Sequence, residues 1–429
     1  MPLQVAIVGA GIGGVTLASY LAKEVKNKGS DKLEVTLFER RSIPSGPSGG
    51  ALLVQGEGLA VLNDLGIMDT LRDVLPSADT VSVPDVPSNR LPRIEASAAV
   101  MTIPGLHRAG HKMPARMYVL RETLLDRLME GSQEHIALRP NLEVSDVREK
   151  DNCVEVDYRP CIDADNEDLM ELAKDPDEVT TANFDLVISA DGCLPCSHAA
   201  KRIPGDGAAP SEREPVLVCQ ALVPRDTSST APMVEQEVYL EQNQGLTGRL
   251  DLGSAVGPGS EIGSLCQWDM VNLTVQLEDP VRGVPRPMLY SAVFNRYMML
   301  VKDTHIVRMA NGVVARADCS HSGGWLHVWV PSKRDGIGRW VSEGGRLAGL
   351  GDAVHPMPPA GGWAASCAMG DARSLAAHIT ALCTKATSKK LEAEDIRSSL
   401  CNYEAARKAV VAPFVAVSVE ETKRVIGAK

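Results

Sequence analysis

Residues 3–25 read LQVAIVGAGIGGVTLASYLAKEV, and this stretch decides the fold. The apolar run at residues 3–8 is typical of a buried parallel strand. Glycines follow at once, and residues 15–25 then place apolar side chains at helical spacing. Residues 33–39, LEVTLFE, form a second apolar run that ends in an acid. The order strand, glycine loop, helix, strand predicts the first unit of a parallel α/β sheet.

The glycines have the spacing G-x-G-x-x-G, with Gly9, Gly11 and Gly14 at the three positions. In this pattern the first glycine allows a tight turn, the second lets a pyrophosphate approach the backbone, and the third lets helix and strand pack closely. The pyrophosphate lies at the helix N-terminus, where N–H groups and the helix dipole favour an anion. Glu39, at the end of the second strand, would accept hydrogen bonds from a ribose. The pattern predicts a dinucleotide site but does not separate NAD from FAD.

Three later segments place polar residues where a strand ends. Arg121 follows the predicted strand 117–120, Asp191 follows the apolar run 186–189, and Asp352 follows the predicted strand at 346–350. Open α/β sheets bind their ligands at the carboxyl ends of the strands. Asp191 therefore lies where a ligand is expected, whereas Arg121, taken alone, is more often a surface ion-pair partner than a ligand.

Between these segments the pattern changes. Residues 204–338 contain short alternating segments separated by Gly and Pro, which predicts a mostly antiparallel sheet. The chain is predicted to be an α/β protein whose Rossmann-like nucleotide-binding domain is built from discontinuous segments, with a β-sheet substrate domain inserted. The expected boundaries are 1–80, 110–203 and 339–385 for the nucleotide domain, 81–109 and 204–338 for the substrate domain, and 386–429 for a C-terminal helical segment.

Composition excludes several classes of protein. The 429 residues carry a formal net charge of -11, which argues against general nucleic-acid binding. No apolar run approaches the roughly 18 residues of a membrane span, and the N-terminus does not resemble a signal peptide, so we expect a cytoplasmic protein. Cys193 and Cys196 form a lone C-x-x-C pair, which favours structural thiols over a metal site. The oligomeric state stays open.

The ordered motifs GAGIGG…FER, DLVISADG and RLAGLGDAVHPMPPAGG, with RETLLDRL and YEAARK, resemble the group A FAD-dependent monooxygenases. This family is related to para-hydroxybenzoate hydroxylase and includes aromatic hydroxylases and tetracycline-inactivating enzymes. The resemblance covers somewhat over half of the chain. It implies an oxidoreductase in which NAD(P)H reduces FAD, and a flavin C4a-hydroperoxide then passes one oxygen atom of O₂ to a small organic substrate. The low aromatic content, 4%, favours a polycyclic or secondary-metabolite-like substrate over a simple phenol.

The resemblance also implies site residues. The three motif glycines would hold the FAD pyrophosphate, Glu39 the ribose, and Arg40 would lie near the adenine. Arg121 would contact the flavin, Asp191 would serve both FAD and the nicotinamide donor, and Asp352 would bind the ribityl chain. The remaining implied cofactor contacts, all beside or below the flavin ring, are Gly50, Ala51, Pro359, Gly362 and Ala365.

The chain departs from the family pattern at two places. Pro195 stands where the family has Ser after Asp-Gly, so the following basic residue is Lys201 or Arg202. The family string G-x-G-x-N is replaced by residues 362–366, GWAAS. Ala364 stands in place of a glycine, Ser366 in place of the Asn, and Trp363 would lie beside the flavin. No catalytic side chain and no metal site is predicted.

Two alternatives to the monooxygenase stay open, and a third is disfavoured. One is a flavin oxidase or dehydrogenase, and another is a flavin-binding protein with little catalysis. The spacing of Trp325 and Trp329 argues against a flavin halogenase.

Overall fold

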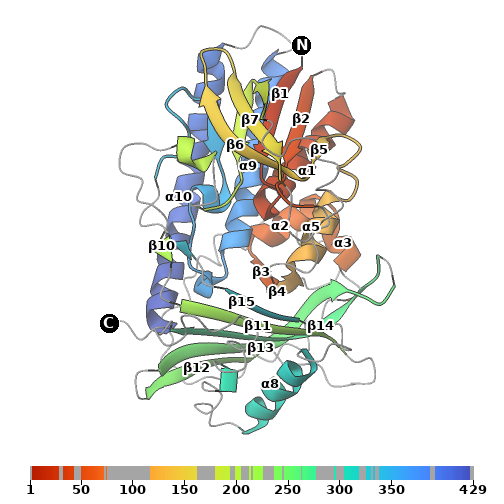
Figure 1. The fold of residues 1–429 in the computed structure, drawn as a ribbon, viewed down its shortest axis with the longest axis vertical. Coiled ribbons are helices and arrows are strands. Elements are labelled where there is room, and N and C mark those ends of the chain that lie inside the picture. The colour runs from red at the N-terminus through yellow and green to blue at the C-terminus, as the bar shows by residue number, and fades with distance from the viewer. Residues whose placement is uncertain are drawn as a thin grey trace.

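A computed structural model provides the structure of the chain (Figure 1). It describes residues 2–28, 32–42, 50–71, 74, 116–161, 179–193, 199–203, 212–213, 216–225, 236–243, 246–261, 263–276, 294–295, 304–317, 325–329, 332–333, 338–386 and 392–425.

The nucleotide-binding half contains a five-stranded sheet in the order β17-β9-β1-β2-β5, and every neighbouring pair is parallel. Its strands are β1 (Leu3–Val8), β2 (Leu33–Phe38), β5 (Ala137–Arg139), β9 (Leu186–Ser189) and β17 (Leu347–Gly349). The central strand β1 is buried at five of its six positions, which explains its apolar composition. Two helices, α1 (Ile12–Lys28) and α9 (Ala364–Ala386), pack against each other beside this sheet.

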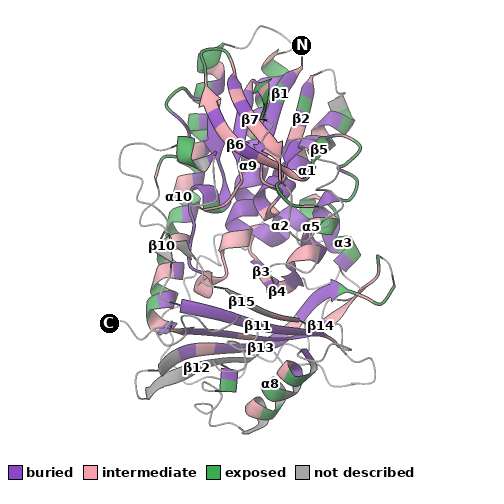
Figure 2. Cartoon of the chain, viewed as in Figure 1, coloured by how far each residue is buried: buried purple, intermediate pink, exposed green. Residues whose placement is uncertain are grey.

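The second half is built on a seven-stranded sheet, with β15-β11-β14-β13-β4-β3 in order and β12 paired to β13. Figure 1 shows it below the nucleotide-binding half, with α8 (Thr304–Ala317) against its far side. Figure 2 shows β11 and β14 buried along most of their length, because both faces of the sheet are covered. The strands are β3 (Ala51–Gln55), β4 (Arg116–Leu120), β11 (Val216–Pro224), β12 (Gln236–Asn243), β13 (Leu246–Pro258), β14 (Leu265–Gln276) and β15 (Trp325–Trp329).

Shorter elements complete the described chain. A three-stranded antiparallel sheet, β6-β7-β8, lies within the nucleotide-binding half. The helical stretch after β3 breaks at Gly66, which has φ 78°, a backbone conformation that favours glycine. The C-terminal segment is the helix α10 (Ala393–Val425). The other elements are α2 (Glu57–Asp64), α3 (Ile67–Leu71), α5 (Arg121–Met129), β6 (Leu142–Glu149), β7 (Val154–Pro160), β8 (Thr180–Phe184), η3 (Ala200–Arg202), β10 (Glu212–Arg213), β16 (Ser332–Lys333), η5 (Gly351–Ala353) and η6 (Pro359–Gly361).

The predicted fold class is confirmed: a Rossmann-like parallel sheet from discontinuous segments, a mostly antiparallel second sheet and a C-terminal helix. The helix α8 is an addition that the alternating pattern of residues 204–338 did not indicate. Strands β3 and β4 hydrogen-bond into the second sheet, since Ala255 and Val256 of β13 pair with β4. The domain boundaries stay a prediction, and residues 81–109 lie outside the described chain. No described helix combines the length and apolarity needed to cross a membrane.

Candidate functional site

A cavity of about 380 Å³ opens at the carboxyl ends of β1, β2, β9 and β17. Its walls come from the glycine loop, from the ends of these four strands and from the start of α9, so segments far apart in sequence meet there. Eight of the predicted site residues line it: Gly9, Gly11, Glu39, Arg40, Arg121, Asp191, Asp352 and Ala365.

Two of the three motif glycines have no room for a side chain, whereas the third faces open space. Gly9 has φ 104°, and a Cβ atom there would lie 2.5 Å from the carbonyl oxygen of Ala190. A Cβ on Gly14 would lie 2.0 Å from the carbonyl oxygen of Gly9, so this glycine lets α1 pack closely on the loop. A Cβ on Gly11 would meet nothing nearer than 4.0 Å. Gly11 therefore leaves its space to the cavity, as expected for close approach of a phosphate.

Glu39 braces the glycine loop. One carboxylate oxygen accepts the backbone N–H of Ala10 at 2.9 Å, and the other accepts that of Arg41 at 2.9 Å. A carboxylate has about four acceptor positions, so further hydrogen bonds to a ligand are possible. Arg40 and Arg41 line the cavity beside it and bring positive charge to this end.

Asp191 and Asp352 face the cavity from the neighbouring strand ends β9 and β17. The carboxylate of Asp191 accepts the hydroxyl of Ser189 at 2.6 Å and the backbone N–H of Ala199 at 3.0 Å. Asp352 lies in η5; its side chain is exposed and lines the cavity, and the protein around it still removes part of its hydration. This partial desolvation raises the pKa of the Asp352 carboxyl, and the nearby His355 opposes the shift.

Arg121 begins α5 directly after β4, and its backbone N–H donates to the carbonyl oxygen of Gly50 at 2.9 Å. Burial and the neighbouring Arg41 lower the pKa of Arg121. An arginine stays charged at neutral pH despite such a shift. Arg121 therefore places a half-buried positive charge on the cavity wall.

Five predicted residues lie outside the cavity lining: Gly14, Gly50, Ala51, Pro359 and Gly362. Both main-chain groups of Ala51 are occupied, since its N–H donates to Gln220 Oε1 at 2.9 Å and its carbonyl accepts from Gln220 Nε2 at 3.2 Å. The next residue, Leu52, lines the cavity instead. Gly362 has φ 66° and ends η6, and a Cβ there would lie 2.5 Å from Leu53.

The helix α9 points its N-terminus at the cavity, where Ala364, Ala365 and Ala368 form the lining. The N–H groups of a first helical turn have no intrahelical acceptor and carry partial positive charge. No acidic residue occupies this turn. An anionic or electron-rich group is therefore favoured there.

Trp363 and Ser366 of the GWAAS string pack away from the cavity. The Trp363 ring stacks on Phe414 of α10, with 4.4 Å between ring centroids. Ser366 is buried, and its hydroxyl accepts the backbone N–H of Gln55 at 3.1 Å. Both departures thus fasten the start of α9 to its neighbours α10 and β3.

A buried ionic cluster lies behind η5 and was not predicted from sequence. Asp371 of α9 is fully buried and contacts His355 Nε2 at 2.5 Å and Arg407 Nε at 2.8 Å, and it accepts the backbone N–H of Gly351 at 3.0 Å. Arg407 of α10 also donates to both carboxylate oxygens of Glu57, at 2.9 and 3.0 Å. Burial alone would raise the pKa of Asp371, but His355 and Arg407 outweigh it and hold that pKa below its usual range.

This cluster fixes the position of Asp352, because Gly351 and His355 flank it in the chain. Two features of the sequence could have indicated this cluster: the YEAARK string, which contains Arg407, and Asp371 in the interior of an apolar helix. The pairing of a buried acid with a particular base depends on how the chain folds, so the periodicity of the sequence did not reveal it.

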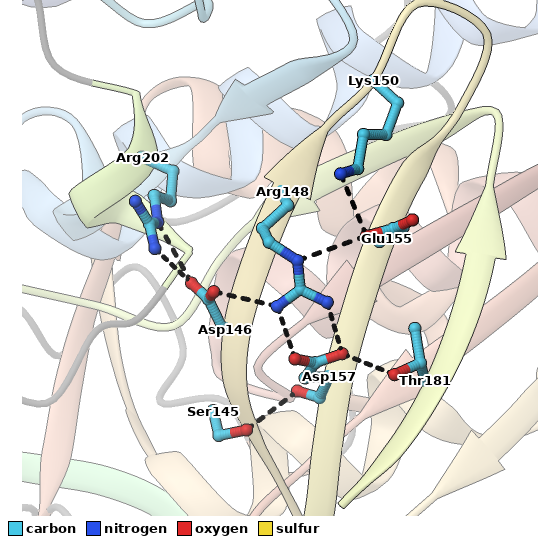
Figure 3. Close-up of polar contacts among 8 residues, drawn as sticks. All are labelled: Ser145, Asp146, Arg148, Lys150, Glu155, Asp157, Thr181 and Arg202. Carbon is cyan, nitrogen blue, oxygen red and sulfur yellow. Dashed lines mark hydrogen bonds and ion pairs between the residues drawn. The ribbon is translucent and has the colours of Figure 1, made fainter.

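The segment after Asp191 is tied to the three-stranded sheet by ion pairs (Figure 3). Arg202 contacts Asp146 at 2.6 Å, and Arg148 bridges Asp146 at 3.0 Å and Asp157 at 2.5 Å. Hydrogen bonds from Arg148 and Thr181 lower the pKa of Asp157. Of the two basic residues considered after Asp-Gly, Arg202 is therefore engaged with β6, whereas Lys201 is exposed.

Comparison with known proteins agrees with this geometry. Residues 7–51 match the model of an NAD(P)-binding Rossmann-like domain. The structure of CtdE in complex with FAD and a substrate has a TM-score of 0.66 at 18% identity, covering 100% of this chain and 90% of that one. Aklavinone-11 hydroxylase with FAD and aklavinone has a TM-score of 0.60 at 18% identity, covering 99% and 69%.

The chain shares its fold with these two FAD-bound structures. Tetracycline destructase Tet(51) shares it as well, with a TM-score of 0.56 at 14% identity and coverage of 100% and 96%. No match was found among curated protein sequences. The resemblance expected from the motifs is thus confirmed for the fold and extends over the whole chain, including the inserted sheet.

Proposed function

We propose that the chain is an FAD-dependent, NAD(P)H-driven monooxygenase that transfers one oxygen atom of O₂ to a small organic molecule. The observation that carries the proposal is the cavity itself. It joins a glycine loop with open space at Gly11, an acid at the end of β2, and Asp352 beside the N-terminus of α9. These are the features that a long dinucleotide with a flavin at one end requires.

The residues present fit FAD along the length of the cavity. The open side of Gly11 and the first turn of α1 suit the pyrophosphate, and Glu39 with Arg40 suits the adenosine end. Asp352 would accept hydrogen bonds from ribityl hydroxyls, and Arg121 is a half-buried cation on the wall. The first turn of α9 suits the electron-rich edge of a flavin ring.

Bound FAD would supply the redox chemistry, accepting a hydride equivalent from NAD(P)H and activating O₂. The protein's part is to bind, orient and exclude water. The unpaired amides of the first turn of α9 would stabilise negative charge, and the two sheets would enclose the substrate between them. The similar structure of aklavinone-11 hydroxylase contains aklavinone, which supports the polycyclic or secondary-metabolite-like substrate that we propose.

The visible absorbance of the purified protein is the first test, because bound FAD gives a spectrum that the polypeptide lacks. Titration of FAD-free protein with FAD should then give saturable binding. A protein that neither retains nor binds FAD would refute the proposal.

A second measurement separates the monooxygenase from a flavin oxidase or dehydrogenase. NAD(P)H and O₂ consumption is followed with a panel of polycyclic phenols, and products are examined for ¹⁸O from ¹⁸O₂. Oxygen incorporation supports the monooxygenase. Stoichiometric hydrogen peroxide without incorporation identifies an oxidase, and no NAD(P)H consumption with any compound identifies a flavin-binding protein with little catalysis.

Asp352 gives a prediction on pH. Its raised pKa means that the carboxylate is protonated at a higher pH than an ordinary Asp, whose pKa is about 3.9. FAD affinity should therefore be full at neutral pH and fall as the pH drops through this raised pKa. Asp352→Ala should weaken FAD binding by about 10- to 100-fold at neutral pH, as for a lost hydrogen bond to a charged group. Asp352→Asn should flatten the pH profile, and an unchanged profile would contradict the assignment.

A further inference from the structure

Hydrogen bonds and packing join strand β3 to the η6 turn at the edge of the cavity. Gln55 Nε2 donates to the carbonyl oxygens of Gly361 at 3.3 Å and Gly362 at 3.2 Å. The Leu53 side chain fills the space that a Cβ on Gly362 would need. We call β3 together with residues 359–362 the β3–turn unit. It carries Leu52 on the cavity wall and leads directly into α9.

Besides the main-chain pairing of β3 with β4, two side chains from other strands of the same sheet hold this unit, one near each end. The amide of Gln220, a residue of β11 that is only 4% exposed, pairs with both main-chain groups of Ala51 as a neighbouring strand would. Arg249 of β13 donates from Nη1 to the carbonyl oxygen of Ala360 at 3.2 Å.

Two hydrogen bonds to the Asp251 carboxylate orient Arg249. Its Nε donates to Asp251 Oδ1 at 2.8 Å, and Asn272 Nδ2 donates to the other oxygen of that carboxylate at 3.0 Å. Cross-strand pairing places Gln220, Asn272 and Asp251 in one row of the sheet, so all three lie on the same face. The row is turned toward the β3–turn unit, because Gln220 reaches Ala51 from it.

We propose that Gln220 and Arg249 are positioning residues for the cofactor: from the inserted sheet they set the β3–turn unit, and with it the Leu52 wall and the N-terminus of α9. The inference rests on the proposed FAD site. A binding site works best when its first contacts are held by a second set of hydrogen bonds. Here that second set belongs to the sheet assigned to the substrate, so cofactor and substrate sites share one support.

The test uses two variants of the full chain, Arg249→Lys and Gln220→Met, with Gln267→Met as the matched control. Lysine keeps the charge beside Asp251 but lacks the planar fork that also reaches Ala360. Gln267 lies in the same sheet and hydrogen-bonds to Val74 and Arg225 instead. We expect each variant to raise the Kd for FAD about 10-fold, as for loss of one hydrogen bond to a charged or buried group, with the control within about 2-fold.

The midpoint potential of bound FAD is the second readout, since a merely structural loss would not move it. Displacing the N-terminus of α9 weakens its stabilisation of the reduced flavin, so the potential should become more negative in both variants. If Gln220→Met does not fold, Arg249→Lys decides alone, because it retains the buried ion pair. A folded Arg249→Lys with unchanged Kd and unchanged potential would overturn the inference while leaving the proposed function intact. Failure of the unaltered protein to bind FAD would overturn both.

Discussion

Arg407→Met should lower the stability of the FAD-free protein by about 3–5 kcal/mol, the usual cost of leaving a buried charge without its partner. Arg407 is 4% exposed and is the guanidinium that pairs with both Asp371 and Glu57. Methionine preserves much of the side-chain volume, so the loss is electrostatic. In thermal unfolding the midpoint should fall by about 3–6 °C for a chain of this size.

Arg424→Met is the matched control, because it makes the same change on the same helix. Arg424 pairs with Glu421 at 3.3 Å near the end of α10, and its side chain is 30% exposed. A pair of this kind contributes about 0–1 kcal/mol, so the midpoint should barely move. Equal effects of the two substitutions would show that the buried cluster contributes no more than a surface pair.

The buried cluster should also matter for FAD. It holds Gly351 and His355 on either side of Asp352, and its loss frees η5. Arg407→Met protein that remains folded at low temperature should therefore bind FAD more weakly than the Arg424→Met control. This comparison separates positioning of Asp352 from global stability.

Gly11→Val should abolish FAD binding and leave the fold intact, whereas Gly14→Ala should disrupt the fold. The structure gives the reason for the contrast. A Cβ on Gly11 meets no atom nearer than 4.0 Å, but one on Gly14 would lie 2.0 Å from a backbone oxygen. The valine methyls occupy the space reserved for the pyrophosphate, and we expect at least a 100-fold loss of affinity, which corresponds to about 2.7 kcal/mol.

Circular dichroism and FAD titration check this pair together. Gly11→Val should keep the secondary structure and lose no more than about 1 kcal/mol of stability, from the weaker helix N-cap. Gly14→Ala should yield little folded protein. A folded Gly11→Val that binds FAD normally would exclude this loop as the pyrophosphate site.

Much of the fold was predictable because its signals are local. The strand 186–189 and the strand 3–8 were predicted at their observed limits, since a buried parallel strand is an uninterrupted apolar run. The glycine loop was predictable because each glycine is needed for a tight turn or a close approach that involves residues only a few positions away. Asp191 and Asp352 were predictable because parallel strand ends share one edge of the sheet.

The contacts behind the site were not predictable in this way. Gln220 occupies the main-chain groups of Ala51 across 169 residues, and Arg407 reaches Glu57 across 350. No periodicity records which buried amide or guanidinium meets which partner. Trp363 likewise looked like a residue beside the flavin, and only packing shows its ring on Phe414.

The sequence by itself determined the parallel Rossmann-like sheet, the glycine loop and the acids at the strand ends, because local spacing dictates backbone geometry and the face on which a side chain emerges. Only the tertiary structure decided what holds those acids and the cavity wall at the start of α9 in place. Buried polar groups must find partners wherever the folded chain provides them, and those partners come from α10 and from the inserted sheet.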